Sequence, residues 1–276
     1  MENVKNLFDL AGRVAIITGG TGLLGQQHAQ AIAGAGGIPI LADIRVTEVD
    51  LHSQDWKARF GEQACAIQAD ITDPKSVKNL LETTLDKFGR VDILINNAAN
   101  NPKMENNVEV EFSRLEFFTL EQWDADLNVG LKGAFLCSQI IGSEMARRKQ
   151  GVIVNVASDL AVIAPDQRLY RKPGLPEDKQ PVKPVTYSVV KTGLIGLTRY
   201  LATYWADSGI RVNAISPGGV YNNQPDDFVE RLAKLIPLGR MANIDEYQAA
   251  ILFLCSDASS YMTGTNLVVD GGRSCW

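Results

Sequence analysis

Short apolar runs alternate with amphipathic stretches along almost the whole chain. The runs RVAIITGG (13–20), IPILAD (38–43) and GVIVNVAS (151–158) are rich in apolar and β-branched residues and have the length of buried strands. The stretches between such runs place apolar residues three and four apart, which is the spacing of one helical face. This alternation predicts an α/β fold: a Rossmann-type, doubly wound parallel sheet with helices on both faces, in three layers.

Capping residues mark the ends of the predicted helices. Asp73 suits an N-cap, Pro74 the first turn that follows, and Gly89 the end of the same helix. Neither an internal repeat nor a low-complexity linker interrupts the alternation. Residues 1–276 are therefore predicted to form a single domain.

The segment 165–184 breaks this rhythm. It contains five prolines, mixed charge and no periodicity. A loop of this length inside a compact domain is either disordered or functional. Its residues Arg168, Tyr170 and Arg171, followed by Lys172, form a cluster suited to a phosphate or carboxylate, although a solvated basic turn or a subunit contact explains it equally well.

The composition narrows the classes of function. The formal net charge of -5 and the lack of a strong basic cluster argue against a nucleic-acid partner. Four scattered cysteines, without a C-x-x-C pair, and two histidines make a metal site improbable. The charged N-terminus does not fit a signal peptide, and no apolar run is long enough to span a membrane. A cytoplasmic protein is the expectation.

The stretch TGGTGLLG (18–25) lies between a predicted strand and a predicted helix, as a phosphate-binding turn requires. Gly19 permits a tight turn, Gly22 lets the backbone approach a pyrophosphate, and Gly25 allows close packing at the start of the helix. Asp43 ends the next strand, where a carboxylate can bind both ribose hydroxyls of an adenosine and repels a 2′-phosphate. The expected cofactor is therefore NAD rather than NADP.

Two further strand ends carry polar groups. Asp70 ends ACAIQAD and is placed to hold the adenine amino group, while NNAA (96–99) ends the next strand. The carboxyl ends of parallel strands meet at one edge of the sheet. A dinucleotide site at that edge follows.

Tyr187 and Lys191, in YSVVK, are four residues apart and share one face of a predicted helix. An ammonium group beside a phenol favours the phenolate and makes proton exchange with an alcohol feasible. Ser158 ends its strand and can hydrogen-bond the same substrate oxygen. The three residues suit hydride transfer between a nicotinamide and a small alcohol or ketone.

At this point the sequence resembles the short-chain dehydrogenase/reductase family, in its single-domain branch, over nearly its whole length. TGGTGLLG, NNAA, GVIVNVAS, YSVVK, VNAISPGGV and VVDGG carry the resemblance. It implies Ser158, Tyr187 and Lys191 as catalytic residues and a homotetramer or homodimer. The cofactor contacts expected from the residues and the resemblance together are Gly19, Thr21, Gly22, Leu24, Gly25, Asp43, Ile44, Asp70, Ile71, Asn97, Ala98, Tyr187, Lys191, Pro217, Gly218 and Val220.

The chain departs from the family pattern in its glycine spacing and in one catalytic position. The single-domain branch reads T-G-x-x-x-G-x-G, whereas Leu23 takes the sixth position here, which matches the extended branch. The asparagine that helps the family hold a relay water is replaced by Gly130, in a long helix predicted over 119–149. Asn128 would lie about 200° away around a regular helix and is not expected to substitute for it.

The third departure is the gap between Ser158 and Tyr187, which spans 29 positions where the family has about a dozen. The excess is the segment 165–184. Because it joins two catalytic residues, it must emerge at the mouth of the site. We expect a substrate-side loop or lid there, with Arg168, Tyr170 and Arg171 as candidate substrate contacts.

Polar residues after PGGV favour a sugar or another hydroxylated substrate over a long acyl chain or a steroid. Segments such as APDQRLY and KPVTYSVVK also resemble a subgroup associated with bacterial surface-sugar and nonulosonic (legionaminic-type) acid biosynthesis. The alternatives are a 3-oxoacyl thioester reductase or gluconate-5-dehydrogenase-like enzyme, a non-catalytic NAD-binding sensor, and a sugar epimerase or dehydratase that retains its NAD.

Overall fold

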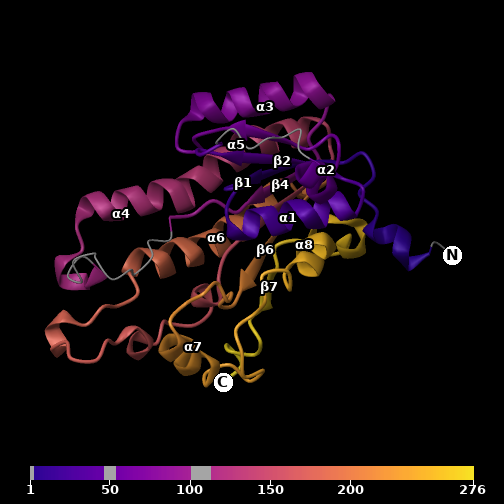
Figure 1. Cartoon of the computed structure of the whole chain (residues 1–276). Helices are drawn as coiled ribbons and strands as arrows, with labels where there is room; N and C mark the ends of the chain where they lie inside the picture. Colours follow the sequence, from indigo (N-terminus) through magenta and orange to yellow (C-terminus); the bar gives the residue numbers. More distant parts are fainter. Residues whose placement is uncertain (1–2, 47–53, 101–112) are drawn as a thin grey trace.

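The computed structural model describes residues 3–46, 54–100 and 113–276. Its centre is a parallel sheet of seven strands in the order β3-β2-β1-β4-β5-β6-β7, with helices on both faces (Figure 1). The predicted three-layer Rossmann-type fold is confirmed. The strands are β1 (Val14–Thr18), β2 (Ile38–Asp43), β3 (Cys65–Gln68), β4 (Ile93–Asn96), β5 (Gly151–Val156), β6 (Ile210–Pro217) and β7 (Asn266–Val269).

Helices cover the sheet in two sets. One apolar core packs the sheet against α3 (Pro74–Phe88), α5 (Gly133–Arg147) and α6 (Val185–Tyr204). The other packs it against α1 (Leu23–Gly34), α2 (Gln54–Phe60) and α8 (Gln248–Cys255). Along β1, Ile16 joins the first core while Ala15 and Ile17 join the second, as expected for a strand buried on both faces.

The predicted ends of α3 are confirmed. The Asp73 carboxylate accepts a hydrogen bond from the backbone N–H of Lys75, Pro74 occupies the first turn, and Gly89 ends the helix in the left-handed conformation. Within the described residues, no helix is both long and apolar enough to cross a membrane.

The long helix predicted over 119–149 contains an irregularity that its sequence does not predict. It divides into α4 (Leu120–Leu127), a π turn over Asn128–Lys132, and α5. A π turn holds more residues than an α turn, so the offset of about 200° expected between Asn128 and Gly130 is too large. Such turns are frequent at functional sites.

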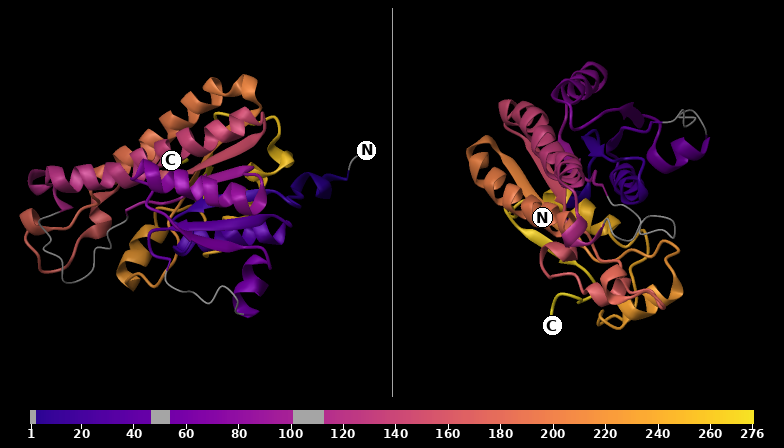
Figure 2. Two further views of the ribbon diagram at one scale, coloured as in Figure 1. Left: turned by 90° about the horizontal axis from the view of Figure 1, so that it is seen from above. Right: turned by 90° about the vertical axis from the view of Figure 1, so that its left-hand side faces the viewer.

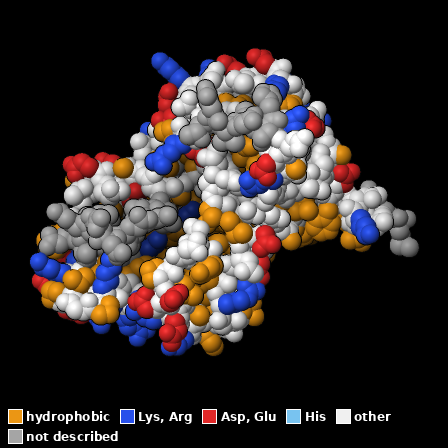
Figure 3. Space-filling model, in the orientation of Figure 1, with side chains coloured by type: hydrophobic (Ala, Val, Ile, Leu, Met, Phe, Trp, Pro, Cys, Tyr) orange, Lys and Arg blue, Asp and Glu red, His pale blue; other side chains and the backbone are white. Residues whose placement is uncertain are grey.

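The segment 165–184 is ordered, so it is not the disordered loop that was one alternative. It contains two short 3-10 turns, Gln167–Tyr170 and Glu177–Lys179. Leu169 is buried with Leu232, Ile236 and Met241, next to α7 (Asp226–Ala233). Figures 1 and 2 show the segment beside α7, leading into the first turn of α6. The face of the molecule seen in Figure 3 is hollowed near its centre, and apolar side chains border the hollow.

Candidate active site

The turn between β1 and α1 is built by close backbone contacts. A Cβ atom on Gly25 would overlap the Gly19 carbonyl oxygen, so a side chain at that position would force the turn open. Gly19 adopts a positive φ of 60°, as a tight turn requires. Gly20, which the sequence argument did not single out, brings the turn against β2, where its Cβ would lie 2.7 Å from Leu41 Cα.

The residues around this turn fit a dinucleotide. Gly22 is the N-cap of α1 and, as a glycine, brings no side chain to cap the first N–H groups of that helix. Unpaired N–H groups at a helix N-terminus are suited to a pyrophosphate. One oxygen of the half-buried Asp43 carboxylate accepts a hydrogen bond from Thr21 N at 3.2 Å, which holds the acid beside the turn.

Asn97 braces the turn from the neighbouring strand. Its side-chain amide donates to the carbonyl oxygens of Thr18 and Gly19, each at 3.0 Å. The Thr18 hydroxyl in turn accepts hydrogen bonds from the backbone N–H groups of Asn97 and Ala98. The side chain of Asn97 is therefore engaged with the turn itself, so its main role here is structural.

The other expected cofactor positions surround the same end of the sheet. The Asp70 carboxylate accepts hydrogen bonds from the backbone and hydroxyl of Thr72, and Ile71 packs in the core. Leu24 and Val220 are half-buried, while Ile44 is exposed. A Cβ on Gly218 would lie 2.8 Å from Asp270 Cα, so the chain after Pro217 packs tightly against the end of β7.

The catalytic candidates meet where β5 ends and α6 begins. Lys191 is buried, and its ammonium donates to the Val156 carbonyl at 2.7 Å. The same ammonium lies 5.8 Å from the centroid of the Tyr187 ring, on the shared helix face that the spacing of four predicts. Ser158 is buried two residues after β5 ends, and its hydroxyl interacts with the Tyr187 phenol. The fold thus brings all three together.

The ionisation of these groups is governed by lost hydration. Burial lowers the pKa of Lys191 to about 8, and the positive charge of Lys183 adds to that shift. Burial also raises the pKa of Tyr187, and the Ser158 hydroxyl opposes this only in part. The net shift for Tyr187 is therefore opposite to the lowering expected from an ammonium at Lys191 alone.

A second ammonium lies closer to the phenol. Lys183 Nζ is 3.9 Å from the centroid of the Tyr187 ring, in the geometry of a cation–π contact. Burial lowers the pKa of Lys183 to about 8, while the negative charge of Asp159 opposes the shift. The sequence argument missed this residue, although K-x-x-x-Y-x-x-x-K places it four residues before Tyr187.

Gly130 lies next to the catalytic helix. A Cβ on Gly130 would lie 2.5 Å from a methyl of Val190, so that methyl fills the space where a side chain at 130 would begin. Both residues line a cavity that also reaches Lys183, Tyr187 and Lys191. An asparagine at 130 would not fit beside Val190 as the two helices are packed.

Of the candidate substrate contacts in the segment 165–184, the tyrosine is half-buried and the two arginines form ion pairs at the surface. Arg168 pairs with Asp166 at 2.6 Å and Arg171 pairs with Glu177, and both arginines are exposed. Tyr170 is half-buried against Phe228, and its pKa, raised to about 12 by burial, is also affected by the charges of Arg273 and Asp159. Of the three candidate substrate contacts, Tyr170 is the half-buried one, and its role as a substrate contact stays a prediction.

Two charged residues that the sequence argument missed complete this end of the sheet. Arg273 and Asp159 form a buried ion pair at 2.7 Å, and the other oxygen of Asp159 accepts a hydrogen bond from the Ser158 hydroxyl at 2.9 Å. Asp159 adjoins Ser158 and was visible in the sequence. Its partner is 114 positions away and was not.

Comparison with known proteins places these features in context. Residues 13–170 match a family model described as short chain dehydrogenase, and residues 179–274 match one described as Enoyl-(Acyl carrier protein) reductase.

The curated relatives include three proteins that are each 33% identical and cover 96% of the chain. They are a (2S)-[(R)-hydroxy(phenyl)methyl]succinyl-CoA dehydrogenase subunit of Thauera aromatica, a D-threitol dehydrogenase of Mycolicibacterium smegmatis and an NAD-dependent glycerol dehydrogenase of Listeria innocua, of which 98%, 94% and 95% are covered. Among solved structures, a gluconate 5-dehydrogenase of Burkholderia cenocepacia J2315 in complex with NADP and tartrate is 26% identical, with a TM-score of 0.85 over 99% of this chain and 100% of that one.

Proposed function

Because the chain is an oxidoreductase that belongs to the short-chain dehydrogenase family, we propose that it interconverts a secondary alcohol and a ketone with NAD as its cofactor. The observation that carries the choice of NAD is the Asp43 carboxylate, held beside the glycine turn by Thr21 N. A carboxylate at this point binds the ribose hydroxyls and repels a 2′-phosphate. Arg45 follows, and its backbone N–H donates to the other Asp43 oxygen, which leaves the carboxylate anchored at both oxygens.

In this proposal each catalytic side chain has one task. Bound NAD supplies the hydride acceptor for alcohol oxidation and, as NADH, the donor for ketone reduction. Tyr187 takes the hydroxyl proton of the alcohol, or returns it to the ketone oxygen. Lys191 holds positive charge close to that phenol, and Ser158 hydrogen-bonds the same oxygen.

We propose a sugar or a sugar-derived polyol as the substrate. Polar side chains gather next to Ser158: Asp159 follows it and pairs with Arg273, and Tyr170 lies near enough for both charges to affect its pKa. The D-threitol and glycerol dehydrogenases named above act on small polyols, which supports the same class here. A nucleotide-linked or nonulosonic-type sugar is the finer form of this proposal.

A 3-oxoacyl thioester is the second candidate substrate. Two observations favour it: a relative in Thermotoga maritima, 32% identical, is named a 3-oxoacyl-[acyl-carrier-protein] reductase, and another relative is named for a succinyl-CoA substrate. The anchored Asp43 argues against the NADPH that an acyl-carrier-protein reductase normally prefers.

The quaternary structure and location are also proposals. Exposed apolar side chains on α5 and α6, among them Phe135, Tyr200 and Tyr204, support a homodimer or homotetramer. We expect light scattering of the purified protein to give two or four copies. The proposed location is the cytoplasm.

The experiment that tests the activity follows nicotinamide absorbance with NAD or NADH. The panel contains free, phosphorylated and nucleotide-linked sugars, small polyols and 3-oxoacyl thioesters. Tyr187→Phe serves as the blank: it removes the proton-transfer hydroxyl, so turnover is expected to fall at least about a thousandfold while NAD affinity stays nearly unchanged.

The outcomes separate the candidates. Turnover on a polyol or sugar, lost in Tyr187→Phe, supports the proposal. Turnover confined to thioesters selects the second candidate. Strong residual activity in Tyr187→Phe would overturn the catalytic assignment, and silence across the panel with intact NAD binding would favour a sensor or a bound-cofactor enzyme.

A further inference from the structure

Beside the catalytic serine lies a buried ion pair between distant parts of the chain. Asp159 follows Ser158 directly, in the short 3-10 turn Asp159–Ala161, whereas Arg273 lies close to the C-terminus. Arg273 donates from Nη1 to Asp159 Oδ2 at 2.7 Å, and the two side chains are only 8% and 5% exposed. Charges this deeply buried are rarely tolerated without a partner, so each of them depends on the other.

The chain after β7 is built to deliver the arginine. The Asp270 carboxylate accepts hydrogen bonds from Gly272 N at 2.9 Å and from Ser274 N at 2.8 Å. The Asp270 carbonyl also accepts a hydrogen bond from Arg273 N. These bonds fold residues 270–274 into a compact turn, and Arg273 reaches the site from a fixed backbone.

The second oxygen of Asp159 is committed to the serine. Asp159 Oδ1 accepts hydrogen bonds from the Ser158 hydroxyl at 2.9 Å and from Leu160 N at 2.8 Å. The Ser158 oxygen itself accepts from Leu160 N at 3.2 Å. The carboxylate therefore holds the single proton of the serine hydroxyl, which must turn away from Asp159 to donate to a substrate oxygen.

The charge of Asp159 also acts on the phenol. Tyr187 lies against the ammonium groups of Lys183 and Lys191 from its own segment. Burial is the main cause of the raised pKa of Tyr187, and the negative charge of Asp159 raises it further. A negative charge near a phenol disfavours the phenolate. Arg273 offsets that charge by direct contact with Asp159.

We propose that Arg273 is a positioning residue for catalysis, because through Asp159 it fixes the hydroxyl of Ser158 and sets the charge that Tyr187 experiences. This rests on the proposed function in one respect, namely that Ser158 and Tyr187 carry the chemistry. Neither Asp159 nor Arg273 is assigned a contact with substrate.

The test measures the ionisation of Tyr187 without any substrate. Each full-length variant is titrated by phenolate absorbance and compared with the same variant carrying Tyr187→Phe, so that the difference reports Tyr187 alone. Arg273→Met leaves the Asp159 carboxylate uncompensated at alkaline pH and is expected to move the Tyr187 midpoint up by on the order of one pH unit. Asp159→Asn leaves the arginine uncompensated and is expected to move it down.

Two controls separate charge from disruption. The double variant Asp159→Asn/Arg273→Met removes both charges and is expected to return the midpoint close to that of the wild type. Arg90→Met is the matched control. Arg90 pairs at 2.7 Å with the buried Asp92 at the opposite end of the sheet, away from Ser158 and Tyr187. This variant should lower stability and leave the Tyr187 midpoint unchanged.

Shifts of the same sign for Arg273→Met and Asp159→Asn, or no shift in either, would overturn the inference. If Arg273→Met does not fold, the titration of Asp159→Asn decides. A downward shift of the Tyr187 midpoint supports the inference when Arg90→Met does not show it, and no shift contradicts it. The substrate panel is independent of this titration. Opposite shifts of the Tyr187 midpoint together with no turnover on any substrate would support the effect of the ion pair on Tyr187 and contradict the proposed function. On any substrate that the wild type turns over, Arg273→Met is expected to lower kcat about a hundredfold, and Arg273→Lys is expected to restore part of the loss.

Discussion

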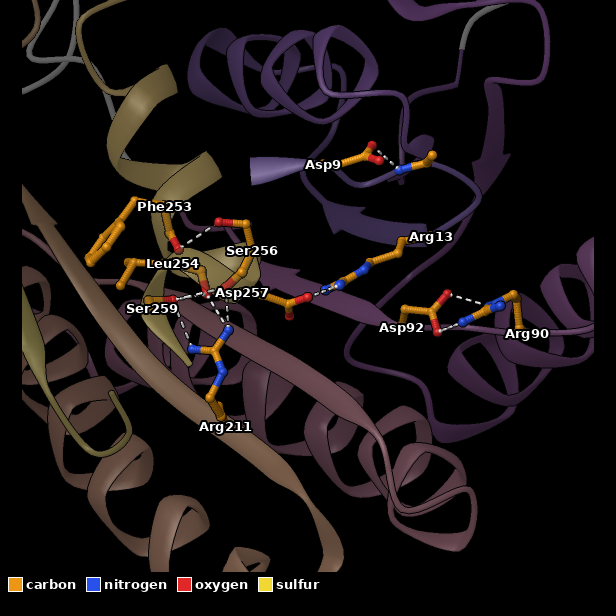
Figure 4. Close-up of polar contacts among 11 residues, drawn as sticks. Asp9, Arg13, Arg90, Asp92, Arg211, Phe253, Leu254, Ser256, Asp257 and Ser259 are labelled. Carbon is orange, nitrogen blue, oxygen red and sulfur yellow. Dashed lines mark hydrogen bonds and ion pairs between the residues drawn. The ribbon is translucent and has the colours of Figure 1, made fainter. Parts of the chain in front are cut away.

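The two ends of the parallel sheet use arginine in different ways. At the end where the strands begin, Arg13 pairs with Asp257 and Arg90 with Asp92, while Arg211 donates to backbone carbonyls after α8 (Figure 4). These contacts join loops and close a helix end. At the end where the strands finish, Arg273 meets Asp159 beside Ser158, with two lysines near Tyr187.

The two ends differ in whether their charged groups can change protonation state. Arg90 and Asp92 form two hydrogen bonds of 2.7 Å with each other, and these raise the pKa of Arg90. Lys183 and Lys191, by contrast, have pKa values lowered to about 8 by burial, because burying their charged forms costs free energy of hydration. One end of the sheet uses its charges for stability, and the other keeps groups whose protonation can change.

The largest effect on stability is expected at the beginning of the strands. Arg211 donates to the carbonyls of Leu254 and Ser256 at 3.1 and 2.9 Å and to the Ser259 hydroxyl at 2.9 Å. Arg211→Met removes all of these hydrogen bonds and should lower the free energy of unfolding by about 4 kcal/mol, measured by urea denaturation. Turnover per folded molecule should stay at the wild-type level. A wild-type urea midpoint would show that other donors replace the guanidinium.

A pH-dependent loss of stability is expected at the other end, behind the glycine turn. His28 is fully buried, and neither ring nitrogen has a hydrogen-bond partner among the described residues. Burial lowers the pKa of His28 from 6.5 to about 4, only partly offset by nearby Asn97. Because the folded-state pKa lies below the unfolded one, the stability is present above pH 6.5 and is lost as the pH falls towards 4.

This loss is measured as the melting temperature between neutral and acid pH. By pH 4 the cost from His28 should reach about 3 kcal/mol. His28→Leu has a similar shape and no proton to bind, so its melting temperature should fall less steeply with acid than that of the wild type. Parallel curves for the two proteins would assign the acid sensitivity to other groups.

A smaller effect is expected where α6 meets the π turn. Gly130→Asn places its Cβ against Val190 and should lower the free energy of unfolding by about 2 kcal/mol through overpacking. Val190→Ala removes the opposing methyl groups, so the double variant should regain part of this loss. Denaturant midpoints of the four proteins form a double-mutant cycle. Additive losses would mean that Val190 is not what excludes a side chain at 130.

The smallest expected effect concerns the cofactor. Asp43→Ala removes the carboxylate that repels a 2′-phosphate and should narrow the preference for NAD over NADP about tenfold, which corresponds to about 1.4 kcal/mol. The ratio of kcat/KM for the two cofactors measures it, and stability should hardly change because Asp43 is only half-buried. An unchanged ratio would show that another group distinguishes the two riboses.

Much of this molecule is determined by patterns that act over a few residues. The alternation of apolar runs and helical stretches predicts the layered sheet, and Asp73 and Gly89 predict the ends of α3. The spacing of four places Tyr187 and Lys191 on one helix face because of the helical period alone. Ser158 and Asp43 follow from the rule that parallel strands end at a common edge.

Other features depend on residues that only the folded chain brings together. Val190 and Gly130 are distant in sequence, and only the packing of α6 against the π turn shows that one fills the space of the other. Arg273 reaches Asp159 across 114 positions, through a turn after the last strand. Local patterns carry no information on such pairs, because a contact between distant segments exists only once the sheet has set their distance. The sequence by itself determined the fold and the candidate catalytic groups, and the tertiary structure decided which charges surround them.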